Sequence, residues 1–289
     1  MDLEKIYEKN YKKFLVISLL ILVLSLGFLG IKLLTTGQLI DRDISIKGGI
    51  SITIYKENID PVIIENSLKG QFPEINVRTL TDIATRRNVG VIVESSTQDE
   101  PALKAAIKEI VDFKEQDYSS ESSGSSFSKG FYNGLIKALI FAFIFMAIVI
   151  FITFRTFIPS VAVLLAVITD IIATFAVISL LGVRLSSAGI VAFLLVIGYS
   201  VDTDILQTTR LLRNKQGSLY ERLKGSMKTG LTMTVAAIAA LSVGYFFATS
   251  PVLKQIFFIV SIALIIDIIA TYIGNASILI WYCKKKNIT

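Results

Sequence analysis

Long uncharged apolar runs alternate along the chain with polar segments, and this pattern predicts six transmembrane helices. The runs cover roughly residues 14–34, 135–154, 158–181, 185–208, 229–248 and 255–282. Each approaches or exceeds the roughly 20 residues that a helix needs to cross about 30 Å of hydrocarbon. The sequence therefore predicts a membrane protein built on an all-α six-helix bundle.

The first apolar run follows four lysines, as the hydrophobic segment of a secretory signal peptide would. It is longer than the roughly 7–15 residues of a cleavable segment, and no small-residue cleavage site comes after it. We therefore interpret residues 1–34 as a cytoplasmic N-terminus followed by an uncleaved transmembrane helix. Residues 131–289 then hold the other five helices.

Charged residues are frequent in residues 35–130, between the first two runs, and the spacing of the apolar residues changes there. Apolar and polar residues alternate over 44–46 and 50–55, on either side of Gly48 and Gly49, which predicts strands with a glycine break. Residues 61–72 have apolar positions at helical spacing. Further strands are predicted around 75–80 and 89–93.

A second helix is predicted to start at Asp99, because Glu100 and Pro101 follow it and apolar residues then recur at helical spacing. The order β-α-β-β-α resembles a ferredoxin-like unit, which needs one more strand. Residues 117–128 contain seven serines. A fourth strand and a flexible Ser/Gly linker both remain open for this segment.

Composition excludes several classes of chemistry. Hydrophobic residues make up 53% of the 289 residues and charged residues 18%, which argues against a disordered chain or an ordinary soluble enzyme. The chain has no histidine, so imidazole catalysis and histidine metal sites are excluded. The single cysteine, Cys283, excludes internal disulfides and thiolate metal clusters. We therefore expect no metal and no cofactor.

The basic residues follow the expected topology. With the N-terminus inside, the inner segments hold 14 Lys and Arg, six of them in the loop 209–228, whereas the short outer loops hold only Arg184 and Lys254. The positive-inside rule then places both termini in the cytoplasm and residues 35–130 outside. Topology therefore explains the net charge of +6 better than nucleic-acid binding does. The loop 209–228 also suits anionic membrane lipid or an acidic partner surface.

A five-residue sequence occurs twice within the apolar runs. Asp170 to Thr174 and Asp267 to Thr271 both read Asp-Ile-Ile-Ala-Thr, near mid-depth of two spans that run in opposite directions. In each copy Asp and Thr are four residues apart and share one helical face. An Asp at the bilayer centre costs about 2.5–3.5 kcal/mol, so it should face protein or water. Hydrogen bonding between helices and ion or proton transport both remain open.

A second set of polar residues lies near the end of the fourth apolar run. It comprises Gly198, Tyr199, Ser200, Val201, Asp202, Thr203 and Asp204, with Arg210 following. The two carboxylates are two residues apart, so they point to roughly opposite sides of a helix. We expect the deeper Asp202 to face the bundle and Asp204 to face the cytoplasmic headgroups, where Arg210 can snorkel. Gly198 permits close backbone approach or a kink.

Together these features resemble the SecD/SecF family of protein-export membrane proteins, within the resistance-nodulation-division superfamily. One span, an external domain and five further spans cover nearly the whole chain. Lys47-Gly48-Gly49 resembles the family's Gly-Gly signature, residues 154–157 its aromatic-Arg-aromatic junction, and residues 198–210 its fourth-span motif. Bacterial members have Asn-Asp-Thr where this chain has Asp202-Thr203-Asp204, which indicates a divergent, archaeal-type member.

The resemblance implies a non-enzymatic accessory subunit of the Sec translocase. It would pair with a SecD-like membrane protein, assist the Sec channel and promote export of unfolded polypeptide, with the proton or sodium gradient as the energy source. The implied candidates for an ion relay or for helix coupling are Asp170, Asp202, Asp204, Asp267, Arg210, Thr174 and Thr271.

Other functions remain as alternatives. A half-size exporter of small molecules or lipids, from the same superfamily, would need to pair with itself. A structural assembly factor would tolerate Asn at every intramembrane Asp. An intramembrane aspartyl protease is disfavoured, because its Tyr-Asp and Gly-x-Gly-Asp motifs do not occur here.

Overall fold

The computed structural model describes residues 3–81, 87–123, 125–214, 216–248 and 250–287. They form two compact units, which we call the helical unit and the α/β unit. The helical unit comprises Met1–Asp41 and Ile136–Thr289, and the α/β unit comprises Arg42–Leu135. The chain passes between the units at 41/42 and 135/136, several residues beyond the limits 34/35 and 130/131 expected from hydropathy.

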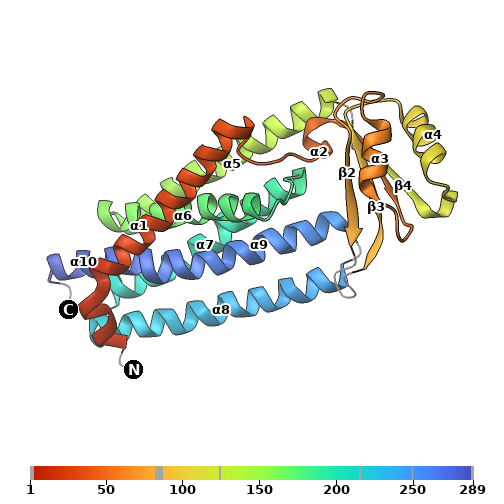
Figure 1. Ribbon diagram of the computed structural model, residues 1–289. Helices are drawn as coiled ribbons and strands as arrows, with labels where there is room; N and C mark the ends of the chain where they lie inside the picture. The colour runs from red at the N-terminus through yellow and green to blue at the C-terminus, as the bar shows by residue number, and fades with distance from the viewer. Residues whose placement is uncertain (1–2, 82–86, 124, 215, 249, 288–289) are drawn as a thin grey trace. The chain divides into compact units, whose positions relative to one another are not determined.

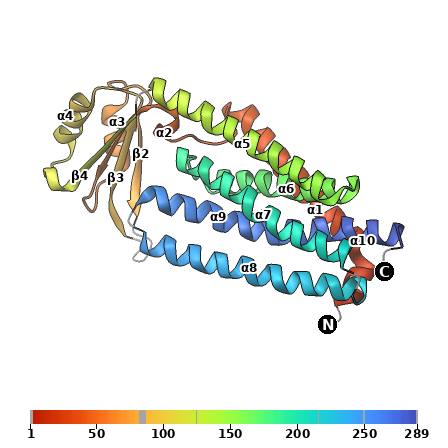
Figure 2. The same cartoon turned by 180° about the vertical axis from the view of Figure 1, so that it is seen from behind.

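Six helices in the described residues are long and apolar enough to cross a membrane, which confirms the six predicted spans (Figure 1). Their elements are α1 (Leu3–Thr36), α5 (Ser125–Phe154), α6 (Phe157–Leu180), α7 (Ser187–Arg213), α8 (Leu219–Phe247), and α9 (Pro251–Ile269) continued by η2 (Ala270–Asn275) and α10 (Ala276–Lys285). The start of α1 and the end of α10 lie at the same end of the bundle (Figures 1 and 2).

Short capped connections set where these helices begin. Ser218 Oγ accepts the amide of Glu221 while the Glu221 carboxylate accepts the amide of Ser218, which is a capping box at the start of α8. Ser186 caps α7 through the amide of Gly189. Arg155 takes a left-handed φ of +52° between α5 and α6, and this reverses the chain within two residues.

The helical unit buries its centre unevenly. Helices α6 and α7 and the sixth span are about half buried, whereas α1, α5 and α8 keep most of their surface exposed within the chain. The exposed surface is mainly Leu, Ile, Val and Phe, which suits lipid or another membrane helix. Most buried polar side chains of this unit lie on α6, α7 and the sixth span; the others described are Ser18 on α1 and Arg222, Ser226 and Thr234 on α8.

The α/β unit has the predicted order β-α-β-β-α, followed by a fourth strand, which the sequence had left open. Its elements are β1 (Gly49–Ile54), α3 (Pro61–Leu68), β2 (Asn76–Thr81), β3 (Asn88–Ser95), α4 (Glu100–Ile110) and β4 (Tyr118–Ser123). The strands pair antiparallel in the order β2-β3-β1-β4, which confirms the ferredoxin-like prediction. The serine-rich segment thus supplies the fourth strand rather than a linker, while residue 124 lies outside the described residues.

One apolar face of this sheet packs against both helices. The core holds Ile50, Ile52, Ile54, Ile64, Leu68, Val91, Val93, Leu103 and Ile107, each essentially inaccessible to solvent. Asp60 and Asp99 cap the two helices by accepting the amides of Val62 and Ala102 at 2.9 and 3.0 Å. The predicted helix start at Asp99 is confirmed.

The predicted strand over 44–46 is wrong. Residues Ile44–Lys47 form a single helical turn, α2, in which the amides of Ile46 and Lys47 both bond to the Asp43 carbonyl. Three alternating residues cannot distinguish a strand from one helical turn. Gly48 and Gly49 then take φ of +83° and +141°, and a Cβ on Gly49 would lie 2.2 Å from the Ser95 carbonyl oxygen. Glycine is required here to start β1.

Candidate functional site

Three carboxyl groups from three helices meet in the interior of the helical unit. Asp170 comes from α6, Asp204 from α7 and Asp267 from α9, and each side chain is at most 1% exposed. Asp170 and Asp267 are the first residues of the two repeated sequences. The fold therefore brings both copies of the repeat to one place, with α7 contributing the third carboxyl. We call these residues the aspartate cluster.

Asp204 and Asp267 share one hydroxyl group. Thr271 Oγ1 lies 3.0 Å from Asp204 Oδ1 and 3.1 Å from Asp267 Oδ1. A hydroxyl donates only one proton, so both bonds form only if one of these carboxyl groups donates a proton itself. Asn275 Nδ2 donates to the same Asp204 oxygen at 2.7 Å. The geometry therefore suits a cluster that holds at least one proton.

Asp170 and Asp267 are held by hydroxyl groups of α7. Ser200 Oγ donates to Asp170 Oδ2 at 2.5 Å, and Thr203 Oγ1 lies 3.1 Å from Asp267 Oδ2. The carboxyl groups of Asp170 and Asp267 are themselves within hydrogen-bonding reach of each other. The same short stretch of α7 thus bonds to both other spans of the cluster, α6 and the sixth span.

No Lys or Arg among the described residues forms an ion pair with the cluster. Carboxylates so close together in a medium of low dielectric cannot all be ionised without a counter-charge. Without a counter-charge the cluster must therefore hold protons, and their gain or loss would change the hydrogen bonds that join α6, α7 and the sixth span. Among the described residues no group of three or more Asp, Glu, His or Cys side chains is arranged to hold a metal ion.

Several buried polar atoms around the cluster have no hydrogen-bond partner within the described residues. They are Asp170 Oδ1, Asp204 Oδ2, Thr174 Oγ1, Thr208 Oγ1, Asn275 Oδ1 and both polar atoms of the Gln207 side chain. Burying such atoms without partners is costly. Most of them are oxygens that can accept a hydrogen bond, so the surroundings of the cluster suit additional protons.

The two copies of the repeat are used differently. Thr271 bonds to its own Asp267 and to Asp204. Thr174 is equally buried, but its hydroxyl bonds neither to Asp170 nor to any other described residue. The sequence identity of the repeat therefore does not extend to its contacts.

The expected orientation of Asp202 and Asp204 is wrong. Asp204 is fully buried, whereas Asp202 is exposed within the chain, on the same side of α7 as Gly198 and Tyr199. Helical angle rather than depth decides this, because Asp204 follows the inward-facing Ser200 by four residues, about one turn. A Cβ on Gly198 would have no neighbour within 4 Å, so of the close approach and the kink that this glycine permits, the close approach is not made within the described chain.

Arg210 lies six residues, about 1.7 turns, beyond Asp204 on α7 and is partly buried. A Cβ on Gly225 of α8 would lie 3.4 Å from its Nη1 atom, so the guanidinium packs beside α8. It makes no ion pair with any described residue.

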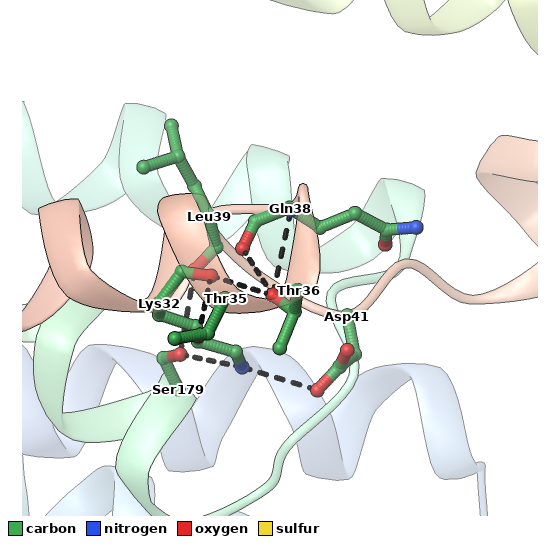
Figure 3. A network of polar contacts seen from close by, with 7 residues as sticks. All are labelled: Lys32, Thr35, Thr36, Gln38, Leu39, Asp41 and Ser179. Carbon is green, nitrogen blue, oxygen red and sulfur yellow. Dashed lines mark hydrogen bonds and ion pairs between the residues drawn. The ribbon is translucent and has the colours of Figure 1, made fainter.

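A second polar network joins the far end of α1 to the rest of the helical unit (Figure 3). Lys32 Nζ donates to Ser179 Oγ of α6 at 2.8 Å and pairs with Asp41 Oδ2 at 3.1 Å. The Asp41 carbonyl accepts the amide of Leu185 at 2.7 Å. Sequence reasoning missed this network, since Lys32 gives only the signal of one charge near the end of a span.

Comparison with known proteins gives a consistent result. The profile of the family described as protein export membrane protein SecD/SecF, C-terminal, matches residues 102–285. The chain is 38% identical to the protein-export membrane protein SecF of Methanocaldococcus jannaschii, over 96% of this chain and 97% of that protein. It is 32% identical to SecF of Pyrococcus furiosus, over 98% and 95% of the two chains.

Among solved structures the fold is similar to SecDF of Thermus thermophilus, described as a translocon-associated membrane protein. The TM-score is 0.70 and the identity 19%, over 94% of this chain but 38% of that one. SecDF in a super-membrane-facing form matches with a TM-score of 0.51 and 19% identity, over 100% and 39% of the two chains. The chain thus spans less than two fifths of SecDF, and at this identity the likeness concerns the fold.

Proposed function

The chain belongs to the SecD/SecF family of protein-export membrane proteins, and from that premise we propose that it is an accessory subunit of the Sec translocase. It promotes the passage of unfolded polypeptides across the cytoplasmic membrane and carries out no reaction of its own. The observation that carries this function is the similarity to SecF proteins over almost the full length of both chains, together with six spans and an α/β unit between the first two.

The partner is a SecD-like membrane protein that supplies the remaining half of a SecDF-like assembly. In support, the chain matches only 38% of the SecDF chain. One face of α7 also suits a partner helix, because Val191, Leu195, Gly198, Tyr199 and Asp202 form an exposed stripe along it. A carboxylate facing lipid is costly. A partner helix with a hydrogen-bond donor at the level of Asp202 removes that cost, and Gly198 lets it approach closely.

The aspartate cluster couples export to an ion gradient. A proton or cation entering the cluster changes the hydrogen bonds of Asp170, Asp204, Asp267 and Thr271 and so favours a different packing of the inner helices. Moving one charge through a potential of 100 mV supplies about 2.3 kcal/mol. Such an energy changes a two-state equilibrium by about fifty-fold, which is enough to drive a cycle between two packings.

Both termini and the loop 209–228 face the cytoplasm, and the α/β unit faces the opposite side of the membrane, where it meets the emerging polypeptide. The distribution of basic residues supports this orientation. The basic loop lies at the lipid headgroups and attracts anionic lipid.

Depletion of the protein in its native cells tests the proposed function. We expect precursors of signal-bearing proteins to accumulate and the wild-type chain to clear them on re-expression. Normal precursor processing would refute the export role and favour small-molecule export. A variant with Asn at Asp170, Asp204 and Asp267 separates coupling from assembly, because a structural assembly factor would retain activity with all three replaced.

A further inference from the structure

The sixth span contains a stretch of π-helix beside the aspartate cluster. In η2 (Ala270–Asn275) the amide of Ala276 bonds to the carbonyl of Thr271, five residues back instead of the usual four. The turn is therefore wider than in α9 and α10, which flank it. Such turns occur often at functional sites, and this one includes two of the residues that hold Asp204.

A side chain from the other end of the sequence bonds to this turn. Tyr7 Oη, on α1, donates to the backbone carbonyl of Tyr272 at 2.6 Å, across a separation of 265 residues. The Tyr7 side chain is 5% exposed, and its ring packs edge-on against Phe14. A buried bond of this length, made to the backbone of an irregular turn, holds the turn at one position.

Two glycines bring neighbouring helices against the same turn. A Cβ on Gly274 would lie 2.4 Å from Ser18 Oγ of α1, and a Cβ on Gly230 of α8 would lie 2.1 Å from Tyr272 Oη. Neither position can take a larger side chain without movement of its neighbours. The π-turn is thus enclosed by α1 and α8. Tyr7 bonds to its backbone from another helix, while Ser277 of α10 donates to its Ile273 carbonyl from within the sixth span.

The turn determines how Asp204 is held. Thr271 and Asn275 are both part of it, and both bond to Asp204 Oδ1, at 3.0 and 2.7 Å. A π-turn has one more residue than an α-helical turn, and one residue corresponds to about 100° of rotation and about 1.5 Å of rise. If the turn relaxed to an α-helix, Asn275 would rotate about the helix axis relative to Thr271, and the two bonds to Asp204 Oδ1 would change in length and direction.

We propose that Tyr7 is a positioning residue for the aspartate cluster: it fixes the π-turn of the sixth span and thereby sets the hydrogen bonds of Asp204. The proposal rests on the proposed function only in assigning ion coupling to that cluster. It makes α1 a partner of the cluster although no described side chain of α1 hydrogen-bonds to Asp170, Asp204 or Asp267.

The effect of Tyr7 is measurable on the purified full chain by infrared spectroscopy. Labelling with ¹³C-aspartate identifies the carboxyl bands that come from aspartates, because it shifts them all. The labelled band that is missing from the spectrum of Asp204→Asn is then the band of Asp204, whether this group is protonated or ionised. Tyr7→Phe keeps the ring and removes the hydroxyl donor. Tyr11→Phe makes the same change one turn along α1, where Tyr11 contacts Lys284, and is the matched control.

We expect Tyr7→Phe to shift the Asp204 band and to lower the gradient-dependent export rate about fivefold, the typical effect of one buried hydrogen bond. Tyr11→Phe should leave both unchanged. An unshifted Asp204 band in Tyr7→Phe overturns the proposal, and so does an equal shift in both variants. Failure of the proposed function looks different: Asp204→Asn would then export normally while the band shift in Tyr7→Phe persisted.

Discussion

Replacing Thr271 and Thr174 separately by valine tests the aspartate cluster at equivalent positions of one repeated sequence. Both threonines end an Asp-Ile-Ile-Ala-Thr segment, and both are fully buried. Thr271 Oγ1 lies 3.0 and 3.1 Å from two carboxyl groups, whereas Thr174 Oγ1 has no partner among the described residues. Valine has nearly the same shape, so the difference between the variants isolates the hydrogen bonds of Thr271.

The expected change in the free energy of unfolding follows from those contacts. Hydrogen bonds between membrane helices contribute about 0.6 kcal/mol on average and at most about 1.7 kcal/mol, while bonds to charged groups contribute about 1.5–3 kcal/mol. Thr271→Val removes one donated and one accepted bond, so we expect the free energy of unfolding to fall by about 1–3 kcal/mol. Thr174→Val removes a buried hydroxyl without a partner and should be neutral or stabilising.

Unfolding in mixed micelles, titrated with a denaturing detergent and followed by helical circular dichroism, measures both free energies. A double-mutant cycle with Asp204→Asn then gives the coupling between Thr271 and Asp204, which we expect to exceed 0.5 kcal/mol, the lower end of the range for residues in contact. Equal losses in the two valine variants would refute the reasoning, because the cost would then come from the shape of the site.

Three further predictions concern other parts of the chain. Asp204→Asn should abolish the dependence of export on the ion gradient, whereas Asp202→Asn should instead reduce the amount of SecD-like partner that copurifies. Gly230→Ala should lower the free energy of unfolding by about 1–3 kcal/mol, because its Cβ overlaps Tyr272 Oη. Acidification should loosen β4. Hydrogen bonds from Ser120 and Tyr118 hold the pKa of Glu100 below its usual value. The stability that ionised Glu100 gives to the fold is therefore fully present above its pKa in the unfolded chain and is lost as the pH falls through its pKa in the folded chain.

Each of these has a control in the same chain. Unchanged gradient dependence in Asp204→Asn, or normal copurification in Asp202→Asn, would contradict the assignment of the two faces of α7. Gly198→Ala, measured without the partner, should be neutral or stabilising, since no atom lies within 4 Å of its Cβ. Amide exchange of residues 118–123 reports on β4, and Glu100→Gln should remove its dependence on pH in the acid range.

Features that repeat along the sequence, such as spans and strands, were predictable. The direction in which single polar side chains point around a helix was not. The six spans and the β-α-β-β-α order followed from long runs and repeated alternation, whereas the serine-rich fourth strand stayed open. The roles of Asp202 and Asp204 were reversed, because depth along α7 says little about which way a side chain points, and two residues separate opposite faces. Ser200, which the sequence did place in a motif, marks the inward face and lies one turn from Asp204.

The π-turn lay beyond sequence reasoning for a different reason. Its residues read as an ordinary apolar helix, and only Gly274 and Asn275 interrupt the pattern. Contacts from distant parts of the chain stabilise it, including Tyr7 and Ser18 of α1. The Lys32 network was missed similarly, because Asp41 and Ser179 meet Lys32 only after α1 and α6 have packed.

These contacts indicate which helix connects the aspartate cluster with the α/β unit. Two helices lead into that unit, α1 and α5. Helix α5 packs on α6 and α7 through apolar side chains, and its carbonyl at Thr153 accepts a bond from Arg213. Helix α1 is bound at one end to the π-turn by Tyr7 and at the other to α6 and Asp41 by Lys32 (Figure 3). A rearrangement at Asp204 that moves the π-turn therefore acts directly on α1. It reaches α5 through the apolar packing of α6 and α7 and through the bond from Arg213.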